Sequence, residues 1–205
     1  MNLRHMGMVC CSIGDYERAA KHFRESVSQA RLGVPTGGYN EARSLCQLGR
    51  TVFLCGDLAQ AKQLFREALE IIRLERLAAH TLADCLDWLA AVVGADGRPR
   101  DAARLFGAAE ARWQASGGLR YAPDRSACAA DVTQVQGKLA DAELAAAGTE
   151  GHALSREQAV DYGLRQTGAH YRPIRARLVV MFHRQSARQH PRLGTDIWNL
   201  SADKQ

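Results

Sequence analysis

A histidine and two aspartates form the stretch of this chain best suited to chemistry. His80 lies four residues before Asp84, and Asp87 lies three residues after it. On a helix these spacings bring the three side chains to one face. No further group that could serve as a nucleophile or metal ligand accompanies the two aspartates, and a His80–Asp84 pair at this spacing is more often a surface hydrogen bond than a metal site. The sequence therefore predicts no catalytic residue, no metal, no cofactor and no enzyme activity.

Two further kinds of chemistry find little support in the sequence. The G-x-x-x-x-G-K-[ST] phosphate loop is absent, so no ATPase activity is assigned to the chain. The six cysteines lack C-x-x-C spacing, and most of them fall on apolar-periodic positions, where free cysteine acts as a small hydrophobe. We expect most of the six thiols to be buried: Cys10, Cys11, Cys46, Cys55, Cys85 and Cys128.

Charge is unevenly distributed along the chain. Residues 165–192 hold seven arginines and no lysine or acidic residue, whereas the whole chain has a net charge of only +5. Association of this basic tail with nucleic acid is one interpretation, and a solvated or disordered extension is the more ordinary one. The candidate residues of the tail are Arg172, Arg175, Arg177, Arg184 and Arg188.

The rest of the composition is that of a globular, non-membrane protein. Apolar residues make up 46% of the chain, yet uninterrupted apolar runs such as Leu178–Phe182 are far shorter than a membrane span. No signal sequence is recognisable near the N-terminus. The sequence predicts a cytoplasmic protein without a membrane partner.

Three segments of the chain repeat the same pattern when they are aligned on a glycine. The glycines are 42 and 41 residues apart, alanine follows each at +5, and phenylalanine follows each at +9. A small residue precedes each glycine by seven positions: Gly7, Gly49 and Ala90. The aligned positions are Gly14, Ala19 and Phe23, then Gly56, Ala61 and Phe65, then Gly97, Ala102 and Phe106.

The repeat predicts pairs of helices joined by a tight turn. Glycine permits the turn, and Asp15 or Asp57 caps the helix that follows. The small residues lie where the two helices cross, and the phenylalanine fills the space between them and the next pair. Because one pair cannot bury these faces alone, we expect an all-α, right-handed superhelical array of antiparallel helix hairpins.

These positions resemble the tetratricopeptide repeat, although the spacing here exceeds its usual period of about 34 residues. Two strings, residues 97–110 and 153–160, are similar to the C-terminal repeat region of bacterial STAND-type ATPases and of LuxR-type or winged-helix transcriptional regulators. That resemblance implies the sensory part of a regulator, which binds a protein, a peptide or a small-molecule effector.

The expected organisation has three parts. Residues 1–112 form three hairpins, residues 113–166 form a helical cap, and residues 167–205 form the basic tail. Within the cap we expect one amphipathic helix over residues 122–147. A second begins with a capping box of Ser155 and Gln158 and runs to about residue 166.

The first helix of each hairpin is expected to line the concave surface of the array, as in tetratricopeptide repeats. Arginines and an aromatic ring beside carboxylates suit the binding of an extended peptide. Exposed, solvated charges are the alternative interpretation. Self-association through an apolar end of the first hairpin is a further expectation. The candidate partner-binding residues are Arg4, Met8, Arg43, Cys46, Arg50, Phe53, Asp84 and Asp87.

Overall fold

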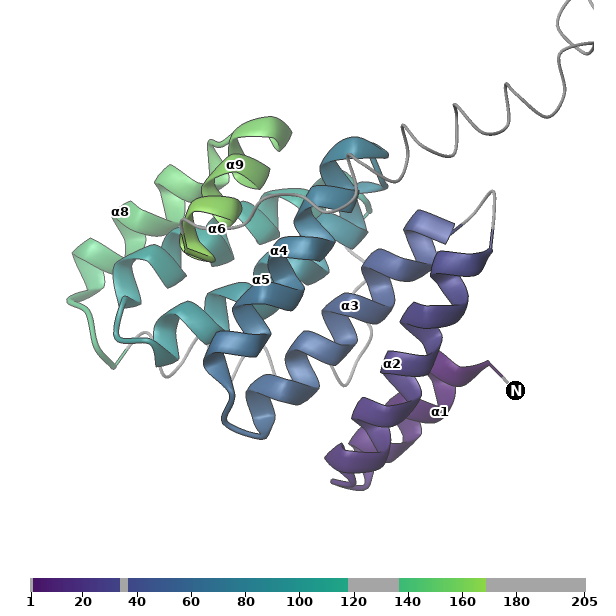
Figure 1. Ribbon diagram of the computed structural model, residues 1–205. Coiled ribbons are helices and arrows are strands. Elements are labelled where there is room, and N and C mark those ends of the chain that lie inside the picture. The colour runs from purple at the N-terminus through teal and green to yellow at the C-terminus, as the bar shows by residue number, and fades with distance from the viewer. Residues whose placement is uncertain (1, 34–36, 118–136, 169–205) are drawn as a thin grey trace, which may run out of the picture. The chain divides into compact units, whose positions relative to one another are not determined.

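The protein is described by a computed structural model over residues 2–33, 37–117 and 137–168 (Figure 1). The chain divides into two units, residues 1–168 and 169–205, and all described residues belong to the first. Every regular element in these ranges is an α-helix. The helices are α1 (Leu3–Ser12), α2 (Tyr16–Leu32), α3 (Gly37–Leu54), α4 (Leu58–Leu74), α5 (Ala79–Ala95), α6 (Pro99–Ala115), α8 (Asp141–His152) and α9 (Arg156–Gln166).

The first six helices form three hairpins, α1–α2, α3–α4 and α5–α6, and each helix packs against the next one in the chain. Figure 1 shows the hairpins following one another in chain order. The predicted all-α array of helix hairpins is confirmed. Among the described residues, no helix is long and apolar enough to cross a membrane.

The turns inside the hairpins depend on glycine. Gly14, Gly56 and Gly97 have φ values of 77°, 92° and 80°, in the left-handed region that L side chains disfavour. Asp15 and Asp57 then cap α2 and α4 by accepting hydrogen bonds from the backbone three residues later. The repeated Gly-Asp pair therefore ends one helix and starts the next.

Close contact between the two helices of a hairpin requires a small residue opposite the phenylalanine. A Cβ added to Gly7 would lie 2.6 Å from the Phe23 ring, and one added to Gly49 would lie 3.0 Å from the Phe65 ring. Both phenylalanine side chains are fully buried. In the third hairpin Ala90 takes the small position. There the corresponding Phe106 is only partly buried.

The alanines of the repeat lie in the same core. Ala19, Ala61 and Ala102 are all inaccessible to solvent. A larger side chain at these positions would push the helix axes apart, so alanine sets the distance at which neighbouring helices pack.

The C-terminal cap differs in part from the expected one. Residues 122–136 of the expected helix over 122–147 lie outside the described residues. The expected helix is wrong for residues 137–140, which form a turn, whereas residues 141–147 are helical. α8 starts only at Asp141, after Ala140 with its extended backbone. The capping box that opens α9 is confirmed, with the backbone nitrogen of Gln158 donating to Ser155 Oγ at 3.2 Å.

α8 lies very close to α6. A Cβ on Gly107 would come within 2.0 Å of the Gly148 carbonyl oxygen, and one on Gly151 within 1.9 Å of the Arg104 carbonyl oxygen. Since those atoms belong to backbone and cannot move aside, only glycine permits this crossing.

Candidate functional site

The candidate partner-binding residues come from α1, α3 and α5, the first helices of the three hairpins. Six of the eight are at least partly accessible to solvent. We define this A-helix face by those six residues: Arg4, Met8, Arg43, Arg50, Phe53 and Asp84.

The structure places the other two candidates in the interior. Cys46 is 3% exposed and Asp87 is 6% exposed. The Trp113 indole nitrogen donates a hydrogen bond to Asp87 Oδ2 at 2.7 Å, which ties α5 to α6. Burial, followed by a hydrogen bond with Cys46, raises the pKa of the Cys85 thiol. Cys46 and Asp87 therefore hold helices together and are not accessible to a partner.

A polar cluster joins α3 to α5 at one part of the A-helix face, with Arg4 of α1 within range of its charge. Arg43 donates to the Tyr39 hydroxyl at 2.8 Å, and this hydroxyl lies 3.4 Å from His80 Nε2. The Tyr39 and His80 rings meet edge to face, with centroids 6.2 Å apart. We call Arg4, Tyr39, Arg43 and His80 the arginine–tyrosine cluster.

The charges of this cluster act on one another. Burial, and then the charge of Arg43, lowers the pKa of Arg4, while Tyr39 and Asp84 act in the opposite direction. Burial and Arg43 likewise lower the pKa of His80. The Arg4 guanidinium thus lies partly buried within range of a second cation, an arrangement that an anionic ligand would stabilise.

A second part of the face is apolar and aromatic. The Arg50 guanidinium lies over the Trp88 ring, 4.0 Å from its centroid. Met8 and Phe53 are partly buried and pack against the core, and Arg4 donates to the Met8 sulfur at 3.4 Å. Arginine stacked on tryptophan, beside accessible apolar side chains, is a surface to which the side chains of a peptide can bind.

Sequence reasoning missed Tyr39 and Trp88, and treated His80 only as a partner of Asp84. The repeat contains a signal for two of them, because Tyr39 and His80 both lie 17 residues before a turn glycine, Gly56 and Gly97. Equivalent positions on successive first helices lie side by side in such an array. Alignment of the copies over this longer span would have paired the two rings.

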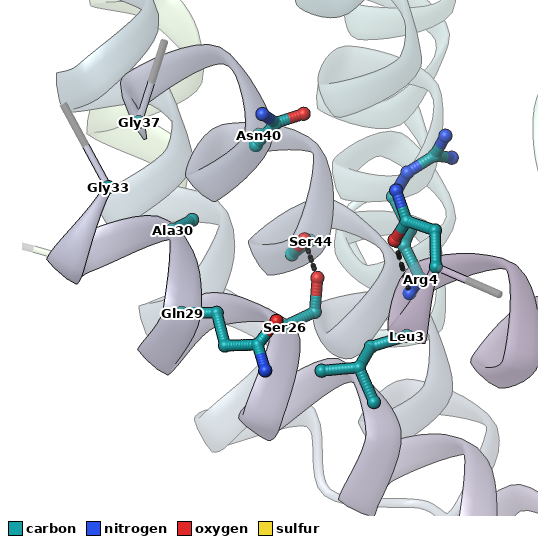
Figure 2. A pocket seen from close by; sticks show the side chains of 10 residues that line it. Leu3, Arg4, Ser26, Gln29, Ala30, Gly33, Gly37, Asn40 and Ser44 are labelled. Carbon is teal, nitrogen blue, oxygen red and sulfur yellow. Dashed lines mark hydrogen bonds between the residues drawn. The ribbon is translucent and has the colours of Figure 1, made fainter. Parts of the chain in front are cut away.

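A pocket of about 500 Å³ lies at the edge of this face (Figure 2). The hydroxyl groups of Ser26 and Ser44 are 2.9 Å apart in its wall. Arg4 stands at its rim with the guanidinium turned away from that pair. The lining is mainly uncharged and polar, and comprises Asn2, Leu3, Arg4, Ser26, Gln29, Ala30, Gly33, Gly37, Asn40 and Ser44.

The remaining candidates concern the tail and metals. The basic-tail residues lie outside the described residues: Arg172, Arg175, Arg177, Arg184 and Arg188. In the described part of the chain, no group of three or more His, Cys, Asp or Glu side chains is arranged to hold a metal ion.

Comparison with known proteins bears on the first two hairpins. A family model for the tetratricopeptide repeat matches residues 1–73. Residues 1–73 are therefore similar to tetratricopeptide repeats. No curated protein and no solved structure matches it. Such repeats generally mediate protein–protein interaction and form a non-catalytic scaffold, which supports a role in binding.

Proposed function

We propose that the protein binds an extended peptide segment rich in carboxylates along its A-helix face. The observation that supports this most is the arginine–tyrosine cluster, in which the partly buried Arg4 is within range of the charge of Arg43, and Arg43 donates to Tyr39. A carboxylate between them forms charge-assisted hydrogen bonds and reduces the repulsion between the two cations.

The apolar part of the face supports a peptide rather than a small anion. Arg50 on Trp88, together with Met8 and Phe53, provides contacts further along the same helices. A peptide with acidic residues at one end and apolar residues at the other matches both parts.

Binding of labelled peptides tests this proposal. Fluorescence anisotropy would compare a pool of acidic decapeptides with the same pool carrying Gln and Asn in place of Glu and Asp. We expect tighter binding of the acidic pool, and at least a tenfold rise in Kd for the Arg4→Ala/Arg43→Ala double variant. Arg24→Ala, an exposed arginine of α2, is the matched control. Equal binding of the two pools would reject the proposal.

We further propose that this binding serves the sensory part of a bacterial transcriptional regulator. The similarity of residues 97–110 and 153–160 to regulator repeat regions supports this role. DNA sequencing around the coding region tests it. An ATPase or DNA-binding domain in the same reading frame is the expected finding, and a transcript that encodes neither contradicts it.

A small-molecule effector is a second candidate, favoured by the pocket beside Ser26 and Ser44. Its wall offers hydroxyl and amide groups, which suit a neutral polar ligand. Thermal stabilisation by a panel of polyols and amides, lost in Ser44→Val, is the expected result. A panel without any effect on the melting temperature would exclude this candidate.

A further inference from the structure

Helix α9 lies at the junction between the second and third hairpins. It contacts α4 on one side and α5 and α6 on the other. Gly163 faces this junction, where an added Cβ would lie 2.9 Å from Leu69 of α4 and 3.2 Å from Leu86 of α5. The backbone of α9 therefore approaches both hairpins closely.

Both hairpins also hold the C-terminal end of α9. Arg66 of α4 donates to the Gly168 carbonyl oxygen at 2.5 Å and to Thr167 Oγ1 at 3.3 Å. Arg98, at the start of α6, donates to Gln166 Oε1 at 2.7 Å and to the Gln166 carbonyl oxygen at 3.0 Å. Two cations at the negative end of the helix dipole stabilise α9 in this place.

A third contact fixes the middle of α9 to α6. The Tyr162 hydroxyl donates to Asp101 Oδ1 at 2.7 Å, and the Arg104 guanidinium lies 4.8 Å from the centre of the Tyr162 ring. Burial, and then Asp101, raises the pKa of Tyr162 to about 12, so this hydroxyl remains a donor at neutral pH.

The junction at which α9 lies has less direct contact between its hairpins. α4 packs less extensively on α5 than α2 packs on α3, where the first two hairpins meet. Leu69 and Leu86, which belong to the two sides of the α4–α5 junction, both face Gly163 of α9. α9 thus occupies space that direct packing of α4 on α5 would otherwise fill.

The same two hairpins carry the cross-helix pairs of the A-helix face. The Tyr39–His80 pair and the Arg50–Trp88 pair each join α3 to α5. Because packed helices shift as bodies, a change at the α4–α5 side of the junction alters the spacing of α3 and α5.

We propose that α9 is a regulatory wedge that sets the spacing of α3 and α5. With α9 docked, the two pairs are held together. When α9 is released, α4 and α5 close on the space it leaves, and α3 and α5 separate at the A-helix face. The consequence for peptide affinity rests on the proposed function, whereas the change in spacing does not.

The primary test removes the two arginines that hold α9. Spin labels on unnatural amino acids at Asn40 of α3 and Ala79 of α5 report the spacing without use of the native cysteines. In the Arg66→Ala/Arg98→Ala variant we expect faster amide exchange in α9 and a label distance longer by about 2 Å. Arg100→Ala, an exposed α6 arginine that pairs with Glu150 of α8, is the matched control.

A second variant keeps the test decisive if the arginine pair affects folding. Gly163→Leu forces α9 away from Leu69 and Leu86 and leaves both arginines in place. We expect the same lengthening. Total helix content by circular dichroism should fall by no more than the 11 residues of α9. An unchanged label distance despite faster exchange in α9 would make α9 a simple cap and overturn the proposal.

Peptide binding separates this proposal from the function it regulates. At least a threefold change in Kd of the acidic peptides, in parallel with the label distance, supports regulation. A longer distance with unchanged affinity overturns it. Failure of the parent protein to bind acidic peptides would reject the proposed function and the regulation, while the distance still decides whether α9 is a wedge.

Discussion

The two junctions between hairpins are built differently although they derive from the same repeat. At the first junction Arg31 of α2 bonds to Glu41 of α3 and to Glu67 of α4, both at 2.9 Å. Burial alone lowers the pKa of Arg31, but the hydrogen bond and charge of Glu41 more than offset this and raise it. One guanidinium thus connects three helices, and α2 packs directly on α3.

At the second junction the equivalent arginine has a different partner. Arg73 lies 17 residues after its turn glycine, as Arg31 does, but the position of Glu41 is taken by Leu82. Arg73 bonds to Glu70 of its own helix and lies 3.9 Å from Asp161 of α9. The comparison indicates that leucine in place of the buried carboxylate removes the ion pair by which this arginine holds the next hairpin, at the junction where α9 packs.

Arg31→Ala is expected to have the largest effect on stability among the changes considered. Glu41 is 1% exposed, and without Arg31 its carboxylate loses its main counter-charge. We expect a loss of about 2–3 kcal/mol in the free energy of unfolding, below the range for fully buried pairs because Arg31 is half exposed. Urea denaturation followed by circular dichroism at 222 nm measures it.

Arg73→Ala is the matched control at the second junction. Its partner Asp161 is largely exposed, so the expected cost is below about 1 kcal/mol. Arg31→Ala/Glu41→Leu, which removes both partners and gives position 41 the leucine found at the equivalent position 82, should recover most of the stability lost. Equal costs for the two arginines would mean that the junctions do not differ energetically.

Ser26→Ala is expected to cost about 1 kcal/mol, because Ser44 is fully buried and loses a hydroxyl partner at 2.9 Å. The second junction has Ala68 and Cys85 at these positions, and the Cys85 thiol donates to a backbone carbonyl instead. Ser26→Ala/Ser44→Cys should therefore be more stable than Ser26→Ala in thermal denaturation. A double variant that is less stable would refute this equivalence.

Local rules in the sequence were sufficient to predict the hairpins. Gly56 and Asp57 encode a turn and a cap within two residues, and Gly49 opposite Phe65 encodes the crossing of the two helices. The capping box at Ser155 was recognisable for the same reason. The place of α9 was not, because it depends on Gly163 meeting Leu69, a contact between residues far apart in the chain.

The candidate site shows the same limit. Arg4, Cys46 and Asp87 occupy the same position in the three copies, ten residues before the turn glycine. A common position predicts that the three side chains point in the same direction, yet only Arg4 is accessible to solvent. Asp87 is buried because α6 brings the Trp113 indole to its carboxylate, a partner that the pattern of α5 alone does not reveal.

Lys62→Met tests the smallest difference between the junctions. Lys62 of α4 bonds to Asp96, after α5, at 2.6 Å, whereas the first junction has Ala20 and Cys55 at these positions. Because both partners are partly exposed, we expect a cost of about 0.5–1 kcal/mol that disappears in 1 M NaCl. Methionine keeps an unbranched apolar chain of similar length, so the variant isolates the charge of the lysine. A cost that persists in 1 M NaCl would contradict an ionic origin for this difference between the junctions.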